Sequence, residues 1–189
     1  MRKITSVSAE GKKQRRNQII AGIILLAVMF LSVLGYSTKG SNNNSIEKVS
    51  YNGFEFVKQN NLWLLQIGNL NFGFVNNPTQ VEKVSTKLEP LSTYYGQPLY
   101  VYSANSDADS EIYRNLNQIA KRIQKACYEE EKCTEDIPFK DCNNKFIIIE
   151  ESNKTEIIQN KSCVFIHSPV ANLTQMSDEF LFKILGVEE

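Results

Sequence analysis

The chain has 189 residues, and its 21 basic side chains (Lys and Arg) balance its 21 acidic ones. The balance is uneven along the chain: six basic residues and one acid precede residue 17, and the remainder carries 15 basic and 20 acidic residues, a net charge of −5. An acidic domain lacks the basic surface that displaces counterions from phosphates, so we expect no nucleic-acid partner.

Residues 17–38 are the first predicted element. These 22 residues carry no charge, and their centre is almost wholly apolar. A helix of that length spans roughly 33 Å, enough to cross a bilayer. The excess of Lys and Arg before it predicts a cytoplasmic N-terminus. We therefore expect a single-pass protein of the cell membrane, with a basic cytoplasmic tail (1–16), a transmembrane helix in contact with the lipid bilayer (17–38), a flexible linker (39–45) and an extracytoplasmic domain (46–189).

Two other interpretations of this segment are weaker. A cleaved signal peptide usually has an apolar region of about 7–15 residues, shorter than the one here, although Val33-Leu34-Gly35 loosely resembles a cleavage site. A pilin-like filament subunit needs a small residue at its processing site, where this sequence has Arg16-Asn17-Gln18. An uncleaved membrane anchor is therefore the favoured interpretation.

Residues 52–74 predict an antiparallel β-meander with an aromatic face. Asn52-Gly53 and Gly68-Asn69 are dipeptides typical of tight hairpin turns. In the runs that follow them, apolar side chains alternate with polar ones, which is the period of a half-buried strand.

The strongest helical pattern runs from Asp107 to about Glu131, with Ser106 or Asp107 as its N-cap. Shorter helices are expected from Thr79 to Leu88 and from Thr174 to Gly186. The apolar runs that predict further strands are residues 99–103, 146–149, 156–159 and 163–167. This order of elements predicts an α+β fold in which helices pack on one side of an antiparallel sheet.

All four cysteines lie within 37 residues, at Cys127, Cys133, Cys142 and Cys163. An even number of cysteines in an exported domain predicts two disulfides. A zinc site is the alternative, but the spacing contains no CxxC pair and the chain has one histidine. Of the three possible pairings we favour Cys127–Cys163 with Cys133–Cys142, because the first would join a helix end to a strand and the second would close a polar loop.

Two further groups of residues are candidates for the surface of the domain. Asn-x-Ser/Thr triplets, which are glycosylation acceptors in exported proteins, begin at Asn43, Asn153, Asn160 and Asn172. Tyr94 and Tyr95 precede a glycine in a predicted loop, and we expect these two side chains at an interaction surface.

The sequence contains no pattern that identifies a catalytic residue, a cofactor site or a metal site. His167 is followed by Ser168, but neighbours on a strand point to opposite faces and the chain has no GxSxG motif. Residues 105–111 carry acids at alternate positions, yet Ser110 stands where a calcium loop requires glycine. A helix N-terminus explains these acids, so we expect no metal and no cofactor.

Four short motifs carry a family resemblance: YNGFEF at 51–56, CYEEEKC at 127–133, FIIIEES at 146–152 and CVFI at 163–166. They resemble motifs in a group of membrane-anchored archaeal surface proteins with no assigned activity, in which an N-terminal anchor precedes a small domain. The resemblance implies an archaeal cell surface and no mechanism.

These features favour a non-catalytic domain outside the cell, which binds another envelope protein or polymer or serves a membrane complex as an accessory subunit. The alternative is an exported hydrolase whose acids converge only in the fold. A hollow containing two or more acids with shifted pKa would favour the hydrolase. An exposed surface at Tyr94 and Tyr95 would favour the binding domain.

Overall fold

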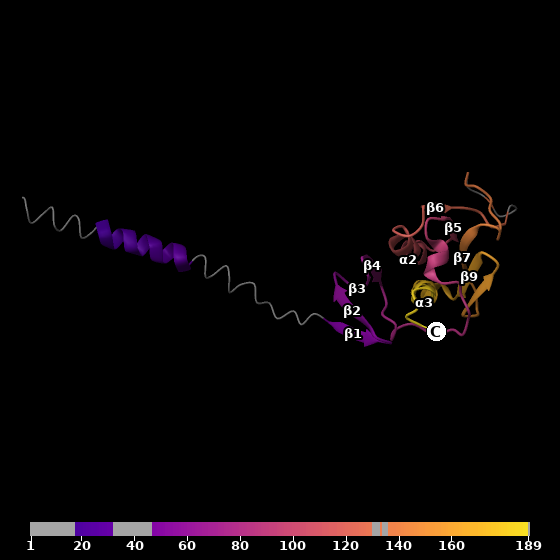
Figure 1. Cartoon of the computed structure of the whole chain (residues 1–189), viewed down its shortest axis with the longest axis horizontal. Helices are drawn as coiled ribbons and strands as arrows, with labels where there is room; N and C mark the ends of the chain where they lie inside the picture. The colour runs from indigo at the N-terminus through magenta and orange to yellow at the C-terminus, as the bar shows by residue number, and fades with distance from the viewer. Residues whose placement is uncertain (1–17, 32–46, 130–132, 134–135, 189) are drawn as a thin grey trace, which may run out of the picture. The chain divides into compact units, whose positions relative to one another are not determined.

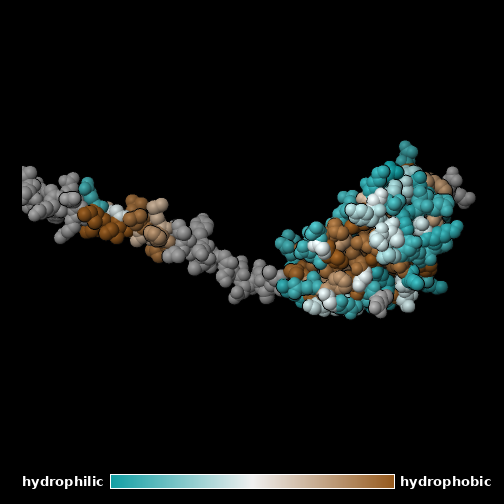
Figure 2. Space-filling model, viewed as in Figure 1, coloured by the Kyte–Doolittle hydropathy of each residue, from teal (hydrophilic) through white to brown (hydrophobic). Residues whose placement is uncertain are grey.

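A computed structural model describes residues 18–31, 47–129, 133 and 136–188. Residues 18–31 form a helix whose visible side is largely apolar (Figure 2). In the part of the chain that is described, no helix combines the length and the apolar character needed to span a membrane. Residue 17 and residues 32–38 of the predicted transmembrane segment, the basic tail and the linker lie outside the described residues. The transmembrane helix therefore stays a prediction.

The domain begins with a four-stranded antiparallel meander in which each strand pairs with the next. Its strands are β1 (Lys48–Tyr51), β2 (Phe54–Gln59), β3 (Leu62–Ile67) and β4 (Leu70–Phe74). Asn52 and Gly53 both have positive φ, 46° and 84°, as the predicted hairpin turn requires. The aromatic inner face is also confirmed, and it consists of Phe56, Trp63, Leu65, Phe72 and Phe74, all buried.

The second sheet has five strands in the order β6-β5-β7-β9-β8. Its strands are β5 (Pro98–Ser103), β6 (Arg122–Lys125), β7 (Lys145–Glu151), β8 (Glu156–Asn160) and β9 (Cys163–Ser168). The β5–β6, β5–β7 and β7–β9 pairs are parallel, and only β8 runs antiparallel to its neighbour. The α+β class is confirmed, but the expectation of a single antiparallel sheet is wrong for this half. The continuous buried run Phe146–Ile149 is typical of a parallel strand that is covered on both faces.

Two helices, α2 (Ser106–Leu116) and α3 (Leu173–Ile184), lie between the two sheets (Figure 1). Two 3-10 turns, η1 (Leu91–Tyr94) and η3 (Val170–Asn172), precede β5 and α3. The aromatic rings of the meander reach α3 directly, because Phe182 packs on Phe56 and on Phe74 with ring centroids 5.7 and 4.7 Å apart. One hydrophobic core therefore joins the meander, the helices and the inner face of the second sheet.

The predicted helix from Asp107 to Glu131 is too long. The helix ends at Leu116, and residues 122–125 form β6 instead. The apolar stripe misled the prediction because Ile119 and Cys127, which continue it, are buried in the turn after the helix and beyond the end of β6 rather than in a helix. The N-cap is Asn105, whose side chain accepts hydrogen bonds from the backbone N–H groups of Asp107 and Ala108.

The helix predicted from Thr79 to Leu88 is absent from these described residues, which have no regular secondary structure. Asn77 accepts hydrogen bonds from the backbone and the hydroxyl of Thr79, so the Thr79 hydroxyl that would cap a helix is already bonded in a turn. The final helix begins at Leu173 rather than Thr174, and Gly186 follows its end with φ 74°.

The outer edge of β4 is closed by side chains of α2 and of the turn that follows it. The buried amide of Asn115 accepts a hydrogen bond from the backbone N–H of Gly73 at 2.8 Å and donates one to its carbonyl at 2.9 Å. Nearer the start of the strand, Gln118 donates to the carbonyl of Asn71. Side-chain amides thus replace a neighbouring strand and connect the meander to α2.

Replacing Asn115 by Ala should lower the free energy of unfolding by about 2–3 kcal/mol, because it leaves the buried N–H of Gly73 without a partner and its C=O with only the 3.4 Å bond from Arg114. Gln118→Ala is the matched control, since its bond lies at the exposed surface and its loss should cost less than about 1 kcal/mol. Chemical denaturation measures both, and equal losses would contradict this role for Asn115.

Candidate functional site

The most unusual side chains of the domain are three consecutive polar residues of α3. Ser177, Asp178 and Glu179 are completely buried, because α3 packs on α2 and on both sheets. Charged groups are rarely buried without partners, since transfer of a charge from water into a protein interior is very costly. The partners of Asp178 and Glu179 therefore define the candidate site.

Asp178 shares its position with a second buried acid, Glu111 of α2. One carboxylate oxygen of Asp178 accepts hydrogen bonds from the backbone N–H and the side-chain amide of Asn76, both at 2.9 Å. One oxygen of Glu111 accepts from Arg114 at 2.5 Å. Oδ1 of Asp178 and Oε2 of Glu111 are the two carboxyl oxygens left, and neither has another hydrogen-bond partner.

These two acids form a carboxyl pair whose free oxygens can share one proton. Burial, and then the charge of Glu111, raise the pKa of Asp178 well above its ordinary value of 3.8. The raised pKa favours the protonated form of Asp178, whose O–H can donate to Glu111. The pair connects α3 to α2 and, through Asn76, to the segment that follows β4.

A hollow of about 410 Å³ lies beside this pair, where the first turns of α2 and α3 meet the end of β4. Among the side chains that line it are those of Asn76, Ser110, Glu111, Arg114 and Gln175. Glu111 is only 1% exposed and Asp178 is fully covered, so the proton they share does not face the hollow. The arrangement suits a stable internal contact better than acid–base chemistry on a bound substrate.

Glu179 contacts the segment that follows β4 at a second position. Its carboxylate lies 3.4 Å from the ammonium of Lys83 and 3.8 Å from that of Lys183, and it accepts a 3.5 Å hydrogen bond from the backbone N–H of Val84. Lys83 also pairs with Glu188 near the C-terminus. Burial is the main reason that the pKa of Glu179 is raised.

A third acid, Glu89, lies at the far end of the same segment and connects it to the second sheet. Glu89 pairs with Lys145 at the start of β7, and this bond is the main reason that its pKa is lowered. Its backbone N–H donates to the side chain of Gln159 in β8 at 2.8 Å. Residues 76–89, called the strap below, are thus held at Asn76, Val84 and Glu89. Figure 1 shows this segment leaving β4 and passing α3 toward the second sheet.

His167 lies at the carboxyl ends of the parallel strands, between two carboxylates. Its Nε2 is 3.7 Å from Glu150 and its Nδ1 is 3.4 Å from Glu156. An open hollow of about 420 Å³ adjoins it, lined also by Tyr102 and Ser152. Ser168 is fully buried, on the opposite face of β9. His167 therefore has acids as its neighbours, and Ser168 does not share its face of the strand.

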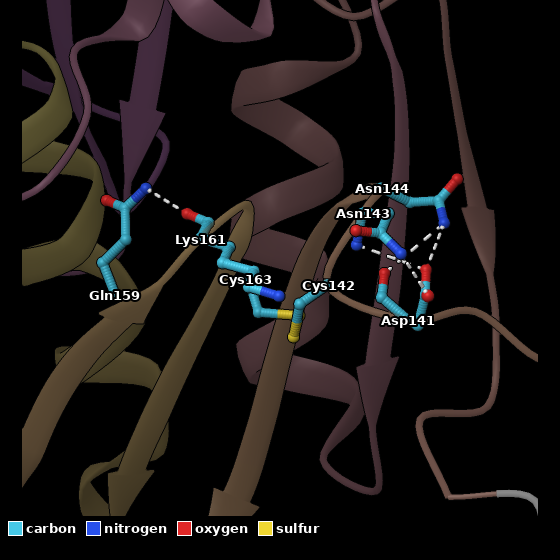
Figure 3. Close-up of a disulfide and its surroundings, with 7 residues drawn as sticks. All are labelled: Asp141, Cys142, Asn143, Asn144, Gln159, Lys161 and Cys163. Atoms are coloured by element: carbon cyan, nitrogen blue, oxygen red, sulfur yellow. Dashed lines mark hydrogen bonds between the residues drawn. A yellow bond between two sulfur atoms is a disulfide. The ribbon is translucent and has the colours of Figure 1, made fainter.

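The four cysteines form two disulfides, as predicted, but the favoured pairing is wrong. The bonds are Cys127–Cys133 and Cys142–Cys163. Cys142 precedes β7 and Cys163 begins β9, so the parallel pairing of these strands brings their Cα atoms within 4.9 Å. In Figure 3 this bond lies between the turn of Asp141 and the start of β9. Because β6 ends just before Cys127, that residue pairs within its own loop instead of with a strand.

The predicted surface residues are only partly brought to the surface. Tyr94 is 1% exposed and packs edge-on against Phe180, whereas Tyr95 is 71% exposed. Of the predicted pair, only Tyr95 therefore reaches solvent. Asn153 and Asn160 are exposed, Asn172 is half-buried, and Asn43 lies outside the described residues.

Within the described ranges, no group of three or more His, Cys, Asp or Glu residues could hold a metal ion. Comparisons with protein families, curated proteins and solved structures found no match to this chain. The site must therefore be interpreted from its own chemistry. The acids that matter most, Glu111, Asp178 and Glu179, had no distinguishing pattern in the sequence beyond lying on apolar helix faces.

The carboxyl pair should make the stability of the domain depend on pH. Because the folded pKa of Asp178 is raised, its stabilisation is complete below about pH 4 and is lost as the pH rises through the folded pKa. Asp178→Asn keeps an acceptor for Asn76 and supplies an N–H for Glu111, so it should remove this loss. Urea denaturation at about pH 5 and about pH 8 measures the change in wild type relative to the variant.

Asp178→Ala serves as the comparison for this variant. It removes the acceptor of both Asn76 bonds and should cost about 2–3 kcal/mol at either pH. If wild type and Asp178→Asn lose the same stability on raising the pH, Asp178 is not the titrating group.

The two disulfides should differ in their contribution to stability. Replacing both Cys142 and Cys163 by Ala opens a 21-residue separation and should cost about 3 kcal/mol, against about 2 kcal/mol for the 6-residue separation of Cys127 and Cys133. Thermal and urea denaturation of the two double variants tests this order. A larger loss for the Cys127/Cys133 variant would contradict it.

Proposed function

We propose that this chain is a membrane-tethered binding protein whose domain, residues 46–189, lies outside the cell and binds another envelope protein or polymer. The observation that carries the proposal is the pair of disulfides in that domain. Disulfides form and persist in oxidising compartments and are rare where thiols are kept reduced. The basic tail and uncharged apolar segment before the domain support the same location.

The surface of the domain supports a binding role. Figure 2 shows an apolar area on the face in view, over the region of β4 and α3, with polar side chains around it. Tyr95, Phe139 and Val170 add large apolar groups that are about half exposed or more. Apolar areas framed by polar residues are typical of surfaces that contact other macromolecules.

The alternative of a hydrolase would depend on the Glu111–Asp178 pair, which lies beside a hollow. Both carboxyls are covered, and their outward hydrogen bonds are already made with Asn76 and Arg114. A carboxylate that acts on substrate must reach the reacting atoms. The closed geometry of the pair favours the binding protein.

Intact mass analysis of the full chain, extracted from the membranes of an expressing cell, tests the location. The four thiols should resist alkylation until they are reduced, and residues 1–36 should be retained in the mass. Free thiols before reduction would overturn the exterior location. Loss of the N-terminal segment would overturn the tether.

A control variant makes the topology test independent of folding. Replacing the basic residues at 12, 13, 15 and 16 by Glu should reverse the bias that keeps the N-terminus inside. A domain that is retained in the cytoplasm should then alkylate without reduction. The domain sequence is the same in both proteins, so only its compartment differs.

A further inference from the structure

A hollow lies between the strap and an unpaired sheet edge. Its volume is about 540 Å³, and strap residues 82–87 line one side while residues 155–159, at β8, line the other. β8 pairs only with β9 and is the last strand of its sheet. Among the described residues, no backbone hydrogen bond joins 82–88 to β8. We call this hollow the strap groove.

The backbone of β8 presents free hydrogen-bonding groups to the strap groove. A two-residue turn, Lys161-Ser162, connects β8 to β9, so Asn160 and Cys163 form the closing hydrogen-bonded pair. In an antiparallel ladder the bonded positions alternate along the strand. The N–H and C=O groups of Ile157 and Gln159 therefore point away from β9, into the groove.

β8 has few of the features that prevent an edge strand from pairing with another strand. Edge strands in natural proteins usually carry lysine, proline or a bulge that blocks such pairing. β8 reads Glu-Ile-Ile-Gln-Asn, with two β-branched residues at its centre, and Ile158 is 42% exposed. Its one charge, Glu156, is directed toward His167 on β9.

The position of the strap limits the size of a partner that can enter the strap groove. It is held on the far side of the groove by Glu179 at Val84, and at one end the backbone N–H of Glu89 bonds to Gln159. Because the strap lines the groove opposite β8, a partner that pairs with β8 must enter between the two. A single extended segment needs only the strand spacing of about 4.8 Å.

We propose that the strap groove binds an extended peptide segment of a partner protein, which pairs with β8 as a sixth strand of the sheet. Main-chain hydrogen bonds to Ile157 and Gln159 give the affinity, and contacts with Ile158 and the strap give the selectivity. This inference rests on the proposed binding function and names the class of partner for it.

A displayed library of random 12-residue linear peptides, selected on the full oxidised chain in lipid nanodiscs, tests the proposal. Gln159→Pro removes the outward N–H, and the matched control Gln159→Ala removes the same side-chain bonds to Glu89 and Lys161 but keeps that N–H. Enriched peptides should bind Gln159→Pro about tenfold more weakly than wild type, and Gln159→Ala less than about threefold more weakly.

Methylation of alternate backbone amides in the same peptides should also weaken binding about tenfold, since a methylated amide cannot pair with a strand. Unblocked cysteines or an altered melting curve would reveal a misfolded Gln159→Pro variant, and the methylated peptides test the proposal without any variant.

Three results would overturn the proposal: no peptide is enriched, enriched peptides bind wild type and Gln159→Pro equally, or methylation has no effect. Self-association of the chain that Gln159→Pro abolishes would assign the edge to a second copy instead. Because these measurements use purified oxidised protein, they stand apart from the location of the domain. A cytoplasmic domain would overturn the proposed function and leave the strap groove result intact.

Discussion

The position of α3 between two sheets is the constraint on which the rest of the structure depends. Phe180, Phe182 and Ile184 fill the core in both directions, and the same burial encloses Asp178 and Glu179. In a medium of low dielectric each acid needs a proton or a counter-charge. The raised pKa of Asp178 favours a proton that can be shared with Glu111, whereas Glu179 lies beside two lysines. The helix is therefore fixed by its polar residues as well as by its apolar ones.

These requirements also fix the strap. The buried carboxylates of α3 are satisfied in part by the backbone N–H groups of Asn76 and Val84, so a segment without regular secondary structure is held in place. Backbone groups that bond to carboxylates do not join a β-ladder. The strap thus passes close to β8 without pairing with it. The space left between the strap and β8 is the strap groove. The free edge, the groove and the buried acids are consequences of one packing arrangement.

The local patterns of the sequence predicted the meander well, because Asn52-Gly53 and the alternating aromatic residues determine turn and face within a few residues of each other. The second sheet was harder: β6 continues the apolar stripe of α2, and a four-residue strand cannot be separated from a helix turn by period alone. The disulfide pairing followed from the parallel β7–β9 register, a long-range feature. Glu111 and Asp178 could not be predicted as a pair, because they lie far apart in the chain and meet only when α2 packs on α3.

The central claim is that the α3 carboxylates hold the strap apart from β8, whose outer edge stays open. Residue-resolved amide hydrogen exchange of the oxidised chain tests it most directly. The account predicts slow exchange at Asn76 and Val84, whose N–H groups bond to Asp178 and Glu179, and fast exchange at Gln159, whose N–H faces the groove. Slow exchange at Gln159 together with fast exchange at Val84 would show that the strap leaves α3 and pairs with β8, which would contradict the account.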